Sequence, residues 1–121
     1  MLSTPHLLVG ATIVKIVPDI AGIPGPVISL PLAYLSHFAL DSIPHWDGSP
    51  RPPFNLKTKL GIVVDYAVGV SLVYLATAGF ENQYLIWLGA FLGTLPDFIL
   101  GTYRHFPNIF EKHAWIAIPN R

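Results

Sequence analysis

Four side chains in this chain have the types and spacing of metal ligands. His37 and Asp41 lie four residues apart, so a helix would place an imidazole and a carboxylate one turn apart on one face. His6 and Asp97 belong to two other apolar segments. Imidazole and carboxylate together suit zinc, and also manganese or iron. We therefore predict a divalent metal site, zinc first, held by these four residues.

Two further residues complete the candidate set. Asp65 lies in the apolar stretch VVDY, and His45 follows Pro44, which ends the segment of His37. Either would act as a further ligand, as a group that orients a ligand, or as a general base. A charge at mid-bilayer costs about 2.5–3.5 kcal/mol on insertion scales, so one retained there is a functional candidate. For Asp65 and Asp97 the alternative is a structural pair with a nearby lysine or arginine.

These ionisable residues stand on stripes of small residues at helical spacing. The stripes are His6-Gly10, Ala33-His37-Asp41, Gly61-Asp65-Gly69 and Gly89-Gly93-Asp97-Gly101. Small residues mark the faces on which membrane helices approach closely. The imidazoles and carboxylates are therefore expected to point at neighbouring helices and to converge.

Composition indicates a membrane protein. Only 12% of the 121 residues are charged, about half the share in soluble domains, and the mean hydropathy is +0.53. The formal net charge is zero, which gives no sign of nucleic-acid binding. There is no cysteine, so disulfides and thiolate metal sites are excluded.

Apolar runs and helix breakers predict four helices, over 5–17, 27–42, 56–78 and 83–103, with Thr4 as the first N-cap and Pro31 near the start of the second. A short amphipathic helix is expected over 107–118. About 20 residues are needed to cross a bilayer, so the last two helices qualify. The first two are short, and would be tilted, re-entrant or covered by partners. We expect one all-α domain over 1–121, an integral-membrane four-helix bundle; a soluble hydrophobic bundle is the alternative.

Basic residues follow the predicted loops. They are Arg51, Lys57 and Lys59 between the second and third helices, and Arg104, Lys112 and Arg121 after the fourth. With four spans, the positive-inside rule places both termini and this loop in the cytoplasm. All the candidate ligands then share one layer near the cytoplasmic face. Lys15 is the exception, near the other end, where it could snorkel.

Several other polar residues are more simply interpreted as structural. Asp19 is expected at a helix end or turn, and Asp47 as a cap of the PHWDG turn. His105 and His113 fit phosphate or metal binding, although interfacial histidines usually have no such role. The Gly89-x-x-x-Gly93 spacing fits packing within the bundle, and also a homo-oligomer.

Three stretches carry a resemblance to a known family: TPHLLVGA (4–11), LSHFALD (35–41) and LGAFLGTLPDF (88–98). They resemble the small bacterial and archaeal integral-membrane proteins described as membrane-bound metal-dependent hydrolases. The resemblance implies a prokaryotic cytoplasmic membrane and functional roles for His6, His37, Asp41 and Asp97. HFALDSIPH is also similar to the HxxxD segment of zinc-dependent phospholipase C and S1/P1-type nucleases. The family's HR…THS segment is absent here, and the PD segment follows HxxxD instead of preceding it.

The leading hypothesis is a metal-dependent hydrolase at the cytoplasmic membrane face. A metal would acidify its bound water and polarise a phosphoryl oxygen. Because the site opens near lipid headgroups, a membrane lipid or lipid-linked phosphoester is the expected substrate. The rival hypotheses are a metal- or proton-binding transport subunit, and a scaffold whose polar residues only hold helices together. The scaffold hypothesis predicts no metal and tolerance of His37→Ala.

Overall fold

A computed structural model of the chain describes residues 3–43 and 55–105. For Arg104 and His105 it describes the backbone only. Four helices make up most of the described residues, and no strand occurs among them: α1 (Ser3–Ile16), α2 (Gly25–Asp41), α3 (Leu56–Thr77) and α4 (Gln83–His105). The expected all-α class with four helices is therefore confirmed. The amphipathic helix expected over 107–118 lies outside the described residues.

The helix starts differ from expectation in the first half of the chain. α1 begins at Ser3, so Thr4 is not its N-cap; the Thr4 hydroxyl donates to Asp65 on α3 instead. α2 begins at Gly25, directly after Pro24. Pro31 consequently lies inside α2 and not in its first turn, and it cannot donate to the carbonyl four residues earlier.

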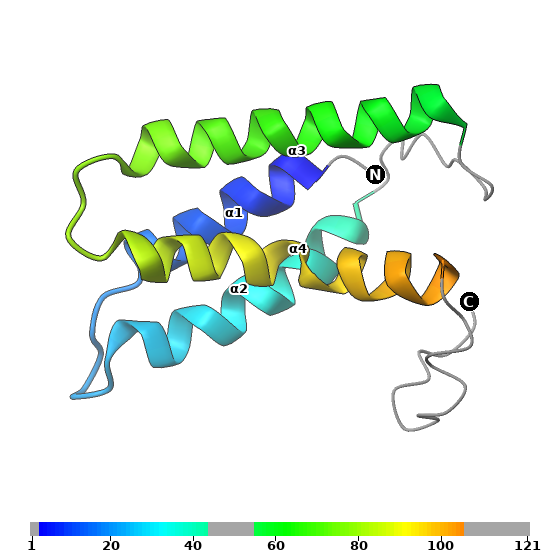
Figure 1. Cartoon of the computed structure of the whole chain (residues 1–121). Helices are drawn as coiled ribbons and strands as arrows, with labels where there is room; N and C mark the ends of the chain where they lie inside the picture. Colours follow the sequence, from blue (N-terminus) through cyan, green and yellow to red (C-terminus); the bar gives the residue numbers. More distant parts are fainter. Residues whose placement is uncertain (1–2, 44–54, 106–121) are drawn as a thin grey trace.

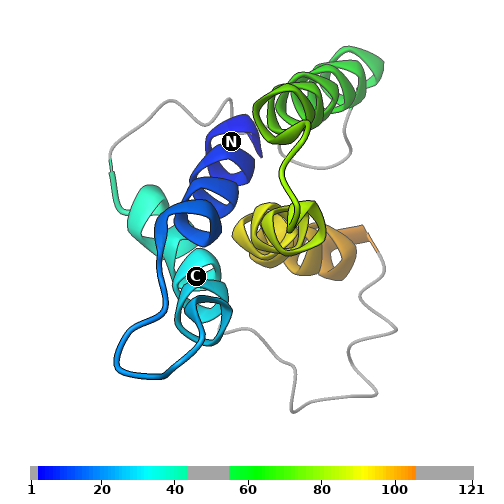
Figure 2. The same cartoon turned by 90° about the vertical axis from the view of Figure 1, so that its left-hand side faces the viewer.

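The helices run in alternating directions along a common axis (Figure 1). α1 begins, α2 ends, α3 begins and α4 ends at one end of the bundle, which we call the site end. α1 packs against all three other helices, whereas α3 touches α4 only sparingly and makes no contact with α2 among the described residues. Viewed along the axis, α3 lies beside α1 and away from α2, and the last part of α4 diverges from its first part (Figure 2). α1 is thus the central element of the fold.

Glycines allow α1 and α4 to cross with their backbones in contact. A Cβ on Gly10 would meet the Gly89 carbonyl and lie 3.3 Å from the Gly93 Cα. A Cβ on Gly93 would in turn collide with the carbonyl of His6. The stripe Gly89-x-x-x-Gly93 therefore serves packing within the bundle.

The other glycine stripes are only partly used. Gly69 on α3 packs closely on α1, where an added Cβ would lie 3.2 Å from the Cα of Thr4. Gly61 and Gly101 have nothing within 4 Å of such a Cβ, so the contact faces of α3 and α4 are shorter than their stripes suggest. The stripe on α2 is longer than expected, because Gly25 and Ser29 are buried as well as Ala33 and His37.

The outer surface of the bundle is strongly apolar. α3 and the stretch Gln83–Tyr103 of α4 are long and apolar enough to cross a membrane, with mean hydropathies of 1.8 and 1.5. Only 17% of the α3 span is buried inside the protein. Large side chains such as Val63, Val64 and Leu75 are at least 60% exposed. An exposed apolar surface of this extent is typical of a helix that faces lipid or a partner. Two candidate spans are therefore shown, and the four-span arrangement remains a prediction.

At the end opposite the site, a tight turn joins α1 to α2, and Asp19 and Lys15 make contacts there. Ala21 and Gly22 adopt positive φ in a tight turn, with mutual backbone bonds between Ile20 and Ile23. Asp19 accepts the first backbone N–H of α2, from Gly25, at 2.6 Å, which confirms its expected place at a helix end. The Lys15 ammonium lies 4.3 Å from the centre of the Phe80 ring.

Candidate metal site

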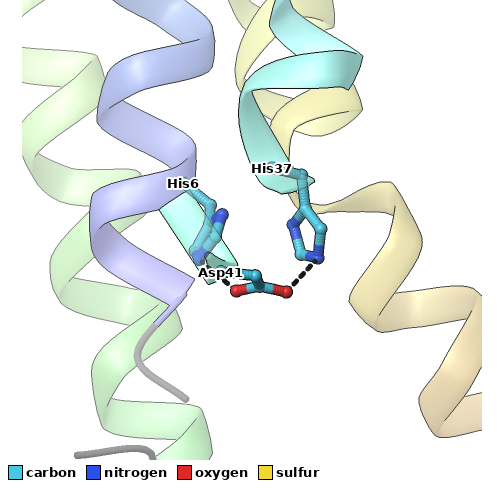
Figure 3. Close-up of side chains that lie close together, drawn as sticks. All are labelled: His6, His37 and Asp41. Carbon is cyan, nitrogen blue, oxygen red and sulfur yellow. Dashed lines mark ion pairs between the residues drawn. The ribbon is translucent and has the colours of Figure 1, made fainter. Parts of the chain in front are cut away.

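His6, His37 and Asp41 meet between α1 and α2 at the site end (Figure 3). Each offers one ligand atom, and these three atoms lie within 4.8 Å of one another. Both histidines are about 3% exposed, while the Asp41 side chain is 36% exposed. Two buried nitrogen donors thus share a carboxylate that reaches toward the outside of the bundle.

The Asp41 carboxylate stands between the two imidazoles. One oxygen lies 3.1 Å from the Nε2 of His37, and the other lies 3.6 Å from the Nε2 of His6 (Figure 3). The first pair follows from the predicted spacing of four residues on one helix. The second pair depends on the packing of α1 against α2, which brings His6 to the other side of the same carboxylate.

The hydrogen bonding of His37 fixes how its ring is protonated. Its Nδ1 lies 3.0 Å from the carbonyl oxygen of Gly93. Because a carbonyl can only accept, Nδ1 carries the proton and donates it. Nε2 therefore presents either a lone pair or a second proton to the carboxylate. An imidazole that donates one N–H to a backbone carbonyl and turns its other nitrogen to the site is the usual arrangement of a metal-ligating histidine.

The two imidazoles lie close enough to bind one ion. The ring centroids of His6 and His37 are 4.4 Å apart. One divalent cation would be bound by both neutral rings and by Asp41. The three ligand atoms lie within 4.8 Å of one another, compared with ~3.3 Å between the ligand atoms of tetrahedral zinc. The residues present therefore fit a divalent metal.

Tight helix packing positions this donor set. His6 lies one turn before Gly10 on α1, and its own carbonyl rests against Gly93 of α4. The carbonyl of the same Gly93 accepts the hydrogen bond from the Nδ1 of His37. Gly93 therefore positions one ligand by close packing and the other by a hydrogen bond.

Asp97 lies next to this group. Its Oδ1 is 3.7 Å from the Nε2 of His37, and its side chain is 27% exposed. His37 therefore faces carboxylates from α2 and α4 with the same nitrogen. Pro96 leaves the Leu92 carbonyl without its intrahelical donor. His37 instead uses the next carbonyl, that of Gly93.

Asp65 is placed differently from the other candidates. Its carboxylate accepts the backbone N–H of Ser3 and Thr4, at 3.2 Å for Thr4, and the Thr4 hydroxyl at 2.8 Å. It is half-buried, and these bonds join α3 to the first turn of α1. Among the described side chains, no lysine forms an ion pair with Asp65, and the side chain of Arg104 lies outside them. Asp65 thus binds the helix that carries His6.

The remaining candidates cannot be placed. His45, Asp47 and His113 lie outside the described residues, and His105 is described by its backbone only. Sequence reasoning missed the contact of Thr4 with Asp65, because Thr4 was expected to act as a local N-cap.

Comparisons of the chain with family models, curated proteins and solved structures gave no match. The resemblance in the three short motifs is therefore untested, and the site rests on the geometry of this chain.

Proposed function

We propose that this protein is a membrane-embedded, metal-dependent hydrolase that acts on a phosphoester at the membrane surface. The observation that carries the proposal is the buried pair of imidazoles around Asp41, with His37 held in one orientation by Gly93. Intramembrane ionisable residues that converge in this way are functional far more often than structural.

The membrane assignment is supported by the apolar surface. α3 exposes large apolar side chains over most of its length, whereas His6 and His37 are buried. With both termini cytoplasmic, as the basic residues predict, the site end would lie near the cytoplasmic headgroups.

Each residue has a defined part in the proposed reaction. His6, His37 and Asp41 would hold the metal, and Asp97 would complete the set from α4. Zinc is the first choice, and manganese or iron would fit with added waters. A bound divalent ion would supply a Lewis acid for the phosphoryl group and a more acidic water. A carboxylate that does not bind the metal would accept the proton of the attacking water.

The substrate class follows from the location of the site. Asp41 is its most exposed member, so a ligand would approach past this carboxylate from the site end. Near the cytoplasmic headgroups, the phosphate group of a lipid or lipid-linked phosphoester would reach the metal site. Its acyl chains would remain in the hydrocarbon core of the bilayer.

The test is hydrolysis by purified protein in lipid vesicles. Phosphate release from a lipid phosphomonoester and from a lipid-linked diphosphate would be measured with Zn²⁺, Mn²⁺ or Fe²⁺. We expect metal-dependent turnover that His37→Ala abolishes and Ser36→Ala retains. Ser36 is the matched control, because it precedes His37 and, among the described residues, its hydroxyl bonds only the Ala33 carbonyl of its own helix, at 2.7 Å. Metal binding without hydrolysis of either lipid would overturn the reaction and support the transport alternative.

A further inference from the structure

α3 contributes no atom to the three-residue donor group, yet it is joined to α1 just before His6. We propose that Asp65 is a positioning residue for the metal site: it holds the first turn of α1, and so holds His6 against Asp41. The inference rests on the proposed metal site and gives α3 a part in it.

The first turn of a helix has backbone N–H groups with no partner inside the helix. In α1, two of these groups, from Ser3 and Thr4, donate to the Asp65 carboxylate of another helix. A negative charge there is also favoured by the helix dipole. α1 thus has an interhelical N-cap, where the sequence suggested a local cap by Thr4.

The connection is reinforced by the Thr4 side chain. Its hydroxyl lies 2.8 Å from a carboxylate oxygen of Asp65 and also 2.8 Å from the Asp65 backbone carbonyl. The close packing of Gly69 on Thr4 sets the approach of the two helices. The hydroxyl has one proton to donate, and both of these acceptors belong to Asp65, so either bond holds Thr4 against α3.

His6 lies two residues after Thr4, in the same first helical turn. Its Nε2 is already the more distant nitrogen from Asp41, at 3.6 Å against 3.1 Å for His37. Fraying of this turn would displace His6 and leave His37, which is held by Gly93, in place. Loss of the Asp65 cap should therefore remove one imidazole from the site and not both.

The experiment uses Cu²⁺ as a spectroscopic probe bound to the full-length protein in detergent. Pulsed electron paramagnetic resonance counts the imidazoles on the ion, and titration gives its affinity. We expect two imidazoles for wild type and one for Asp65→Asn, with affinity reduced about 10–100-fold, as for other residues that orient ligands. His6→Ala should give the same single-imidazole spectrum.

Asp19→Asn is the matched control, because Asp19 also caps a helix start by accepting the Gly25 N–H, at the opposite end of the bundle. It should keep two imidazoles, and circular dichroism would show that each variant retains its helices. Two imidazoles and wild-type affinity in Asp65→Asn would overturn the inference alone. No bound metal in wild type would overturn the proposed function with it, so the two failures are distinguishable. If Asp65→Asn unfolds, Thr4→Val replaces it, because this change removes the hydroxyl bond to Asp65. One imidazole with reduced affinity would support the inference, and two imidazoles at wild-type affinity would again overturn it.

Discussion

The most informative residue is His37, because its two ring nitrogens have different neighbours. Nδ1 donates to the Gly93 carbonyl, and Nε2 faces Asp41 and Asp97 at 3.1 and 3.7 Å. This division of roles is what a ligand requires, since the bond on one nitrogen orients the lone pair on the other. The sequence predicted the pair of His37 with Asp41 because both lie on one helix.

The two carboxylates around His37 should differ in importance. Asp41 lies 3.1 Å from the Nε2 of His37 and 3.6 Å from the Nε2 of His6, whereas Asp97 lies 3.7 Å from the Nε2 of His37. Asp41→Asn should therefore weaken Zn²⁺ binding by more than about 100-fold, and Asp97→Asn by about 10–100-fold. Competition with a chromophoric zinc chelator measures both affinities. An equal or larger loss in Asp97→Asn would show that the ion sits between α2 and α4 and not beside His6.

The contact of His6 with Asp41 and the role of Asp65 could not be predicted in detail. Both depend on how α1 packs against two other helices, and no spacing within one segment encodes that. The glycine stripes indicated which faces meet, but Gly61 and Gly101 showed that a stripe can extend beyond its contact.

Among the helices, α1 and α4 form the crossing on which the site depends. A Cβ at Gly93 would collide with the carbonyl of His6 and also approach Gly10 at 3.3 Å. Gly93→Ala should force the helices apart, at a cost of about 1–3 kcal/mol typical of overpacking, and should lower metal affinity.

The control for this substitution lies on the same helix. Gly101→Ala adds a Cβ into open space and should leave both stability and metal binding intact. Unfolding in a graded detergent mixture would give the stabilities, and zinc titration the affinities. Equal behaviour of the two variants would contradict the account of the crossing.

The four helices themselves could be predicted well because apolar runs end at prolines, glycines and polar turns. The predicted bounds of α3 and α4 differ from the structure by no more than two residues. α1 and α2 began two residues earlier than expected, since Asp65 caps α1 from outside and Pro24 precedes α2 directly. A cap supplied by another helix leaves no local signal.

For the whole molecule, the central prediction is the direction of the bundle in the membrane. Reporter fusions at Gly22, Pro50, Gly79 and Arg121 should give periplasmic, cytoplasmic, periplasmic and cytoplasmic signals, because the basic residues other than Lys15 flank the second and fourth positions. The alternating helix directions in Figure 1 place the turns of Gly22 and Gly79 at the same end. A periplasmic signal at Pro50 would contradict this topology.

The most direct test of the account is the metal content of the wild-type protein purified in detergent. After loading with Zn²⁺ and removal of free ion, elemental analysis should find one zinc per chain. His37→Ala should hold none while remaining helical and monodisperse, because it removes a ligand from the end of the bundle, and Ser36→Ala should match wild type. Absence of stoichiometric metal in wild type, after loading with zinc, manganese and iron in turn, would contradict the metal site and leave a structural cluster of His6, His37 and Asp41.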